Sequence, residues 1–116
     1  LRENAMQIVN SQVSDVTVIA LSGSLDAASV ADFDAEWKAA LDAGATKLVV
    51  DLGGIEYISS AGLRGILMLS TTARAGNVQV IFSDLRSMVA EMFKLSGFTN
   101  ILRTAPDTAS AVEDLA

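Results

Sequence analysis

Apolar residues along this chain follow two different periods, and each period predicts one kind of secondary structure. Short runs that are continuous or alternate every second residue predict strands. These runs cover Met6–Val13, Val16–Leu21, Lys47–Leu52, Val78–Phe82 and Asn100–Arg103. Apolar residues at steps of three and four predict helices. These cover Ala28–Ala43, a segment from the Ser59-Ser60 pair to about Ala75, a segment after Ser83-Asp84, and Ala109–Leu115.

The stretch Lys47–Ser70 is the one around which the other elements are organised. Its first part, Lys47–Leu52, carries a continuous apolar run, as in a strand that is covered on both faces. Gly53-Gly54 predicts a turn, after which Ile55–Ile58 resumes an extended segment. In the helix that follows, the spacing predicts an inward stripe and an outer face. The stripe is Leu63, Ile66, Leu67 and Ser70, and the outer face includes Arg64, Met68 and Thr71.

A serine pair stands at the start of this helix. Ser59 or Ser60 is the predicted N-cap, whose hydroxyl accepts a hydrogen bond from a free amide of the first turn. The simplest interpretation is capping alone. The alternative is a functional hydroxyl, because unpaired N–H groups and the positive end of the helix dipole converge there and favour an anion. Gly62 in the first turn is a poor helix former, which indicates a reason other than helix stability for its presence, such as close approach by a partner.

The other helices carry patterns that are interpreted mainly as core. The first has the stripe Val30, Phe33, Trp37 and Leu41, and its aromatic residues are read as core, not as a ligand platform. Acidic residues off this stripe are expected to form a solvated face and not a metal cluster; they are Asp32, Asp34, Glu36 and Asp42. The third helix is expected to turn one face inward, with Leu85, Val89, Met92, Phe93 and Ser96 on it. Its residues Met88, Met92 and Phe93 are read as core packing, with a partner-binding stripe as the alternative.

The predicted order of elements is β-β-α-β-α-β-α-β-α. Ser14-Asp15 predicts a hairpin between the first two strands, and Ser22–Asp26 is expected to leave the sheet, with Asp26 as a cap or turn aspartate. Helical crossovers make the remaining strands parallel. The sequence therefore predicts a single α/β domain over residues 1–116, with a mixed sheet of about five strands and four helices packed mainly on one face. Residues 1–5 are expected to be a cloning remnant or a frayed start.

Composition argues against several classes of ligand and location. The net charge is −6 with only eight Lys and Arg, which argues against nucleic acid as the direct ligand. The chain has no His and no Cys, so the commonest acid–base group, thiol chemistry and disulfides are all missing. No window approaches the roughly 18 unbroken apolar residues that a membrane span needs, and no secretory leader is evident. We therefore expect a cytoplasmic protein.

Motifs of catalytic and cofactor sites are also missing from the sequence. It contains no P-loop, no G-x-S-x-G and no dinucleotide-binding fingerprint. Ser60 has no recognisable base partner, so it is not expected to be a nucleophile. Gly53-Gly54 ahead of a helix is a weak signal for a phosphate. These observations predict a binding protein without a cofactor or metal, and not an enzyme.

Three blocks of the sequence resemble the STAS family of bacterial anti-sigma factor antagonists. The stretch DLGGIEYISSAGLRGIL resembles the family signature, and GSLDAAS at Gly23–Ser29 is similar to an earlier family segment. The stretch LRSMVAEMFKLSGFTNIL resembles the third block. The blocks stand in the family order and cover most of the chain. The resemblance implies the same mixed-sheet fold.

By this resemblance, Ser60 corresponds to the family's phosphorylated serine. The aspartate that usually precedes it is Ser59 here, the second family serine is Ala61, and a frequent glycine is Arg64, which is able to pair with a phosphate. Asp26 becomes a functional carboxylate beside the phosphoserine loop. The residues expected to support this loop or bind the partner are Gly23, Asp26, Ser59, Gly62, Leu63 and Arg64.

The resemblance implies a binding module that is switched by charge. In this hypothesis the unmodified chain docks on an anti-sigma factor with a kinase fold, and a sigma factor is released. The partner binds ATP and transfers phosphate to Ser60. The departures at Ser59 and Ala61 motivate an alternative, a STAS accessory or scaffold subunit, for example of a lipid-transport ATPase or of a larger regulator. The chain is expected to be a monomer or a weak dimer.

Overall fold

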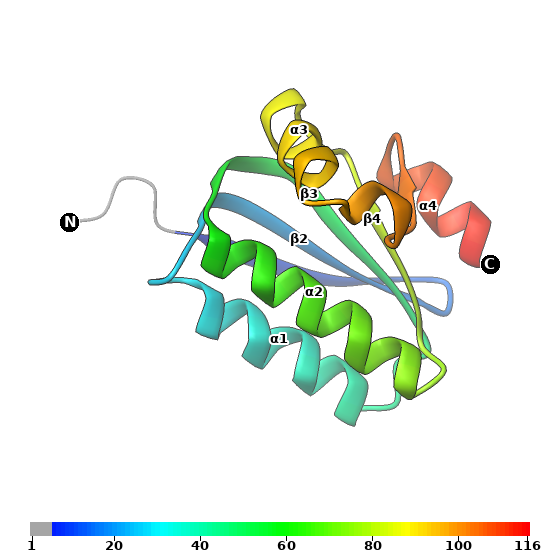
Figure 1. Ribbon diagram of the computed structural model, residues 1–116. Helices are drawn as coiled ribbons and strands as arrows, with labels where there is room; N and C mark the ends of the chain where they lie inside the picture. The colour runs from blue at the N-terminus through cyan, green and yellow to red at the C-terminus, as the bar shows by residue number, and fades with distance from the viewer. Residues whose placement is uncertain (1–5) are drawn as a thin grey trace.

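One mixed sheet runs through the protein, and its strands lie in the order β1-β2-β3-β4-β5 (Figure 1). The structure is a computed structural model that describes residues 6–116, so the expectation for residues 1–5 lies outside the described residues. The strands are β1 (Gln7–Val13), β2 (Val16–Leu25), β3 (Lys47–Ile58), β4 (Gln79–Ser83) and β5 (Thr104–Ala105). The helices are α1 (Val30–Asp42), α2 (Ser60–Ala75), α3 (Ser87–Leu95) and α4 (Thr108–Leu115), with a 3-10 turn η1 (Phe98–Asn100). The predicted α/β order is confirmed.

Within residues 6–116, one neighbouring pair of strands is antiparallel and the other pairs are parallel. Strands β1 and β2 form a hairpin around Ser14-Asp15, and β2, β3, β4 and β5 are parallel, as their helical crossovers require. The Nζ atom of Lys47, the first residue of β3, lies 2.7 Å from Oδ2 of Asp15. This ion pair joins the hairpin turn to the start of the central strand.

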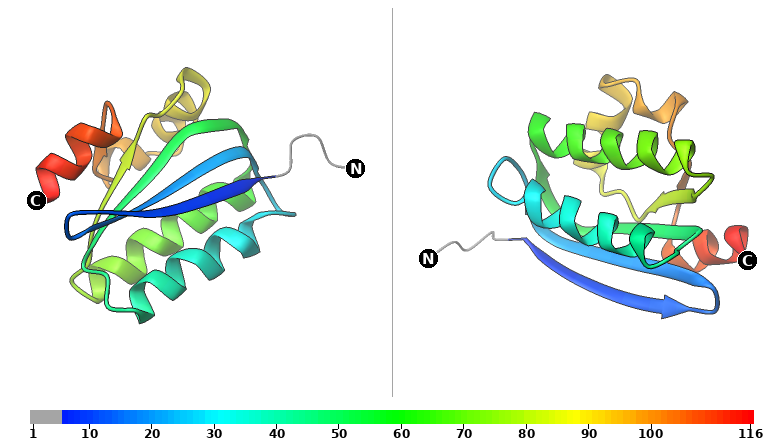
Figure 2. Two further views of the ribbon diagram at one scale, coloured as in Figure 1. Left: turned by 180° about the vertical axis from the view of Figure 1, so that it is seen from behind. Right: turned by 90° about the horizontal axis from the view of Figure 1, so that it is seen from below.

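The helices cover the two faces of the sheet unequally (Figure 2). Helices α1, α2 and α3 pack on one face, where they enclose a large core. Helix α4 packs on the opposite face over β3, β4 and β5. The smaller core beneath α4 consists of Val16, Val18, Val49, Ile81, Ala105, Ala111 and Leu115. The expectation of helices mainly on one face is therefore confirmed.

Aromatic side chains fill the larger core. Phe33 and Trp37 of α1 are buried, as the helical spacing predicts. Phe93 of α3 packs edge-to-face between Phe82 of β4 and Phe98 of η1. Core packing is thus the correct interpretation for Phe93. Met92 is half-buried against the same core, whereas Met88 is exposed.

Two acidic residues of α1 differ from the expected solvated face. Asp34 is half-buried, and its Oδ1 accepts a hydrogen bond of 3.1 Å from the Trp37 indole Nε1. Glu36 is also half-buried and accepts a hydrogen bond of 2.7 Å from Asn10 Nδ2 of β1. Asp32 and Asp42 are exposed as expected. Helix α1 therefore carries two polar contacts that the helical period alone does not reveal: one within the helix at Asp34, and one with β1 at Glu36.

Three strand predictions are wrong in their bounds. The sequence predicts that Ser22–Asp26 leaves the sheet, yet β2 continues to Leu25, with register shifts that absorb the irregular backbone around Gly23. Strand β3 passes through Gly53-Gly54 without a turn, because Gly54 pairs with Ser22 of β2, whereas the register skips Gly53, whose N–H donates to Asp51 Oδ1 at 2.8 Å. The last strand is Thr104–Ala105, and not Asn100–Arg103, because the chain first closes the η1 turn onto the core.

The inward face of α2 is rotated from its predicted position. Its buried residues are Gly62, Leu63, Gly65, Ile66, Leu69 and Ala73. Leu67 is exposed and Ser70 is half-buried, so these two members of the predicted stripe are corrected. The expected stripe on α3 is corrected likewise at its end, since Ser96 is exposed. The outer positions Arg64, Met68 and Thr71 are exposed as predicted.

Candidate functional site

The two serines at the start of α2 have different roles. Ser59 is the N-cap, with extended backbone angles, and its side-chain oxygen accepts a hydrogen bond of 3.3 Å from the Gly62 N–H. Ser60 is the first residue of the helix, and its side chain is exposed. The cap is therefore provided by Ser59, and the Ser60 hydroxyl is accessible at the end of the helix where the dipole is positive.

The end of β2 holds the first turn of α2 in place. The Leu25 carbonyl oxygen accepts a hydrogen bond of 3.0 Å from the Ser59 N–H. A Cβ atom added to Gly62 would lie 2.4 Å from the same oxygen. Gly62 is therefore required by contact with the chain's own backbone, and the partner named as an example from the sequence is not needed to explain it.

Asp26 lies in the loop that follows β2, next to this anchored turn. Its Oδ1 accepts hydrogen bonds from the Ala28 and Ser29 N–H groups, at 3.0 and 3.2 Å. The Ser29 hydroxyl in turn donates to the Ser24 carbonyl oxygen at 2.7 Å. The carboxylate thus orders the loop between β2 and α1, as a turn aspartate does. Because Leu25 is paired with Ile58, this loop and the start of α2 leave the sheet side by side.

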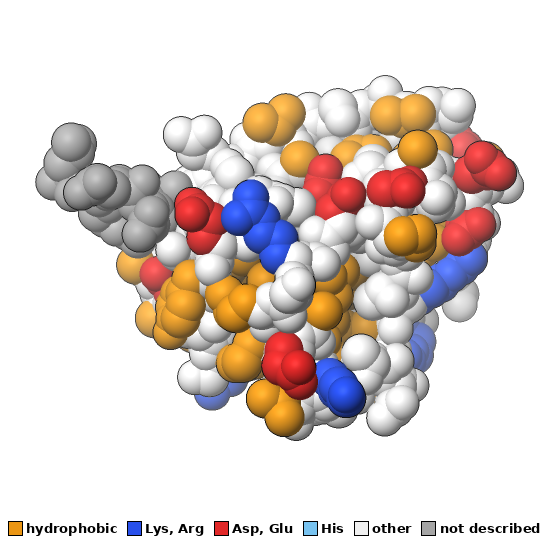
Figure 3. Space-filling model, turned by 90° about the horizontal axis from the view of Figure 1, so that it is seen from above, with side chains coloured by type: hydrophobic (Ala, Val, Ile, Leu, Met, Phe, Trp, Pro, Cys, Tyr) orange, Lys and Arg blue, Asp and Glu red, His pale blue; other side chains and the backbone are white. Residues whose placement is uncertain are grey.

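Arg64 lies one helical turn beyond Ser60 and is exposed. Residues four apart on a helix are neighbours on its surface, so the guanidinium is within reach of a group attached to Ser60. A shallow groove of about 130 Å³ runs beside Arg64, between α1 and α2. It is lined by Val30, Asp34, Ala61, Arg64, Gly65 and Met68. Figure 3 shows exposed apolar side chains among charged ones on the upper side of the molecule.

This groove is the part of the site that the sequence did not predict. It exists because α1 and α2 approach closely, and a Cβ atom on Gly65 would lie 2.6 Å from Val30 Cγ2. Gly65, three residues after Gly62, was the sequence signal for close helix packing, but helical spacing alone does not show which helix packs against it. Tyr57, just before the serine pair, is also exposed.

The other predicted support residues lie farther into the fold. Leu63 is buried in the large core and supports α2 from below. Gly23 has a φ of +96° within β2, where its register partner is Ile55. Glycine is required there by the left-handed backbone. The structure therefore brings Asp26, Ser59, Ser60, Gly62 and Arg64 to one end of α2, and places Leu63 and Gly23 behind them.

The helix dipole contributes to the electrostatic character of this end of α2, beside the charged side chains of Asp26 and Arg64. No acidic residue stands in the first turn, so the positive dipole end is not neutralised within the helix. The pKa values that are clearly lowered belong to Asp15, through its hydrogen bond with Lys47, and Asp107, through the Ser110 N–H. Both residues lie outside the candidate site. Among residues 6–116, no group of three or more acidic, His or Cys side chains could hold a metal.

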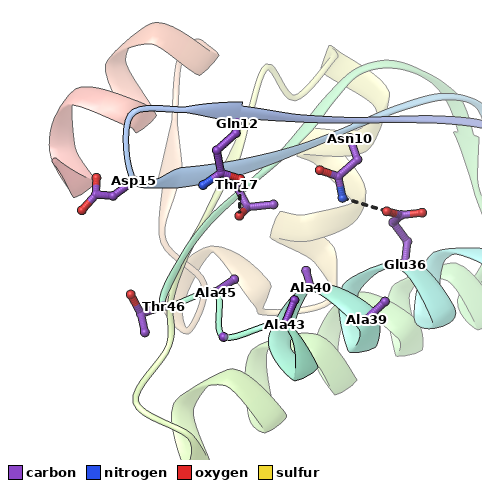
Figure 4. A pocket seen from close by; sticks show the side chains of 11 residues that line it. Asn10, Gln12, Asp15, Thr17, Glu36, Ala39, Ala40, Ala43, Ala45 and Thr46 are labelled. Carbon is purple, nitrogen blue, oxygen red and sulfur yellow. Dashed lines mark hydrogen bonds between the residues drawn. The ribbon is translucent and has the colours of Figure 1, made fainter.

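A second groove, of about 520 Å³, lies away from this site, between β1 and the C-terminal half of α1 (Figure 4). Asn10 and Gln12 of β1 point into it, and Asn10 donates to Glu36 across it. Besides Glu36, its α1 side consists of the alanines Ala39 and Ala40. Over the part of the chain that the structure describes, no helix is long and apolar enough to cross a membrane.

Comparisons with known proteins connect this geometry to a family. The family model described as Mlab, STAS domain, matches residues 8–104. BtrV of Bordetella bronchiseptica, provisionally named an anti-sigma factor antagonist, is 31% identical over 106 residues, which are 91% of this chain and 91% of BtrV.

Two solved structures share the fold. The crystal structure of an anti-sigma factor antagonist from Mycobacterium paratuberculosis has a TM-score of 0.90 and 16% identity, with 98% of this chain and 97% of that chain covered. The Bacillus cell fate determinant SpoIIAA in its phosphorylated form has a TM-score of 0.75 and 20% identity, with 95% and 100% covered. At these identities the two structures establish the architecture.

Proposed function

Since this chain belongs to the STAS domain family, we propose that it is a cytoplasmic anti-sigma factor antagonist whose binding is switched by phosphorylation of Ser60. The unmodified chain binds an anti-sigma factor that is also a serine kinase, and a sigma factor is thereby released. The partner binds ATP and transfers the phosphate, and this chain provides the hydroxyl. The observation that carries the proposal is the exposed Ser60 side chain at the first position of α2, with capping already provided by Ser59.

The surface around Ser60 is suited to a contact that a phosphate disrupts. The groove between α1 and α2 and the exposed side chains of Tyr57, Leu67 and Met68 offer apolar area near the hydroxyl. Phosphorylation adds a charge of about −1.5 to −2. A change from mostly bound to mostly free requires about 3–5 kcal/mol. Desolvation and like-charge repulsion supply that amount in a packed contact, whereas at an exposed rim they do not.

The free protein is able to tolerate the same phosphate. The unpaired N–H groups and dipole at the start of α2 favour an anion, and Arg64 lies one turn away. The modification therefore weakens binding without unfolding the chain. This separation of folding from binding is what a reversible switch requires.

The test uses the cognate kinase and three forms of the chain: wild type, Ser60→Ala and Ser60→Asp. We expect Ser60→Ala to retain binding in a calorimetric titration and to abolish incorporation of labelled phosphate. We expect Ser60→Asp to weaken binding at least about a hundredfold, as a loss of about 3 kcal/mol implies. Ser59→Ala is the matched control, since it removes a neighbouring hydroxyl that is occupied by capping, and it should still accept phosphate. Equal affinities of the Ser60→Ala and Ser60→Asp variants for the kinase would refute the switch.

A second candidate is a STAS accessory or scaffold subunit, for example of a lipid-transport ATPase or of a larger regulatory assembly. Two observations favour it: Ser59 and Ala61 depart from the family pattern, and the matching family model is described by its STAS domain and not by a sigma regulator. Genes for transporter subunits beside this one would support this candidate. Genes for a kinase-like ATPase and a sigma factor would support the first.

A further inference from the structure

The two edges of the sheet differ in how they are protected from pairing with another strand. The β5 edge is only two residues long and is flanked by Arg103 and Pro106, which are common edge protections. The β1 edge is seven residues long, QIVNSQV, with no charge and no proline. Its pairing with β2 is continuous, without a bulge. In residues 6–116, no strand lies on the outer side of β1.

The hairpin determines which backbone groups of β1 point outward. Val13 and Val16 close a two-residue turn, so this pair exchanges ladder hydrogen bonds. Bonded pairs recur at every second residue of an antiparallel ladder. The N–H and C=O groups of Ile8, Asn10 and Gln12 therefore point to the open edge. These three residues are evenly spaced around Asn10.

We propose that β1 pairs with β1 of a second copy of this chain, antiparallel and centred on Asn10, to form a continuous ten-stranded sheet across a two-fold axis. In this register Asn10 faces its own copy, and Ile8 faces the partner copy's Gln12. All outward backbone groups of Ile8, Asn10 and Gln12 then find partners. No other register of this strand with itself uses all of them.

The side chains of β1 are compatible with this pairing. Val9 and Val13 are 63% and 44% exposed and lie on the face away from α1. In the proposed register Val9 lies opposite Ser11 of the second copy and diagonal to that copy's Val13, so apolar side chains meet without a clash of charges. Asp15 at the hairpin turn is paired with Lys47. The strand itself thus adds no like-charge repulsion between two chains of net charge −6.

Disulfide trapping tests the register directly, because the chain contains no cysteine. Facing residues of a bonded antiparallel pair have Cα atoms about 5.5 Å apart, within disulfide range. Asn10→Cys should therefore form a disulfide-linked dimer under mild oxidation. In Ser11→Cys, the control, the two cysteines are diagonal and about 7–8 Å apart, so no dimer should be trapped. Equal trapping of both variants, or none with Asn10→Cys, would overturn the proposed pairing.

Sedimentation of the untagged 116-residue chain tests the dimer without a new covalent bond. We expect a concentration-dependent dimer that strengthens with added salt, because two acidic chains repel each other less when screened. Val9→Lys should weaken the dimer at least tenfold, whereas Leu95→Lys, at an exposed apolar residue away from β1, should not. Ser60→Ala should dimerise like the wild type, which separates this proposal from the proposed function. A chain that remains monomeric at all concentrations and salt levels refutes the pairing and leaves the β1 edge for a strand of another protein.

Discussion

The Leu25 carbonyl oxygen, at the end of β2, accepts a hydrogen bond from the Ser59 N–H at the start of α2. These residues are far apart in the sequence, and their contact fixes the position of the exposed Ser60 relative to the Asp26 loop. The end of β2 thus positions the candidate phosphorylation site through a hydrogen bond to Ser59, the N-cap of α2. The position of Ser60 therefore depends on a hydrogen bond between backbone groups, and not on contacts between side chains at the surface.

Gly62→Ala should destabilise the protein markedly. The new Cβ atom would lie 2.4 Å from the Leu25 carbonyl oxygen, so either the helix or the strand must move. Overpacking of this kind costs about 1–3 kcal/mol or more. Gly76→Ala, where the nearest atom is 3.6 Å away, is the matched control and should cost little. Urea unfolding followed by the fluorescence of Trp37 measures both, and equal midpoints would contradict the role of the Leu25 contact.

Ser59→Ala and Ser60→Ala should differ in stability although they are adjacent. Loss of the Ser59 cap leaves the Gly62 N–H without its side-chain acceptor and should cost about 1 kcal/mol. Ser60 is exposed in the first turn, where alanine is a good helix former, so Ser60→Ala should be close to neutral. Urea unfolding of the two variants checks this order. A larger loss for Ser60→Ala would mean that the assignment of the cap is wrong.

Ser60→Asp should leave the free protein as stable as the wild type or slightly more stable. An acidic side chain in the first turn of α2 interacts favourably with the helix dipole, by about 0.3–1 kcal/mol. Arg64 should add about 0.2–0.5 kcal/mol as a neighbour four residues away. A double-mutant cycle with Arg64→Gln measures this coupling in low salt. If Ser60→Asp destabilises the free protein, a loss of partner binding by this variant could be explained by unfolding and not by the added charge.

Asp107→Ala should reduce stability at neutral pH and lose its effect in acid. The Ser110 N–H donates to Asp107 Oδ1 at 2.7 Å, and this bond lowers the pKa of the carboxyl in the folded protein. A group whose folded pKa is lowered stabilises above its unfolded pKa, and this contribution is lost as the pH falls through the folded pKa. The difference in melting temperature between wild type and Asp107→Ala should therefore shrink as the pH falls below about 4. A constant difference across this range would contradict a charge-dependent cap.

Most of the fold could be predicted because its helices and strands carry strong local periods. The spacing of Phe33 and Trp37 predicts the buried face of α1, and the apolar run at Leu48–Val50 predicts a strand that is covered on both faces. Glycine was the main source of error. Gly53-Gly54 indicates a turn by composition, but the pair lies within β3, where Gly54 pairs with Ser22 of β2 and a register shift accommodates Gly53.

The sequence indicated which residues belong to the candidate site, but it did not predict their hydrogen bonds or which face of α2 is buried. Helix spacing and resemblance indicated Ser60 and Ser59, but the sequence could not say which serine caps α2, since that depends on the direction of one hydrogen bond. The inward face of α2 was misplaced by the assumption that Leu67 is buried. Close packing of Gly65 on Val30 rotates the helix instead and exposes Leu67. Contacts between distant segments decide these features.

The sheet divides the apolar interior into two compartments of unequal size. The smaller core is covered by the eight residues of α4, which contribute few buried side chains to it. We therefore expect α4 to unfold locally at a lower free energy than α1 and α2. In hydrogen exchange, the amide protons of α4 should exchange first, while those of α1 and α2 remain protected. Local opening of α4 would then leave Ser60 in place, because α2 packs on the opposite face of the sheet.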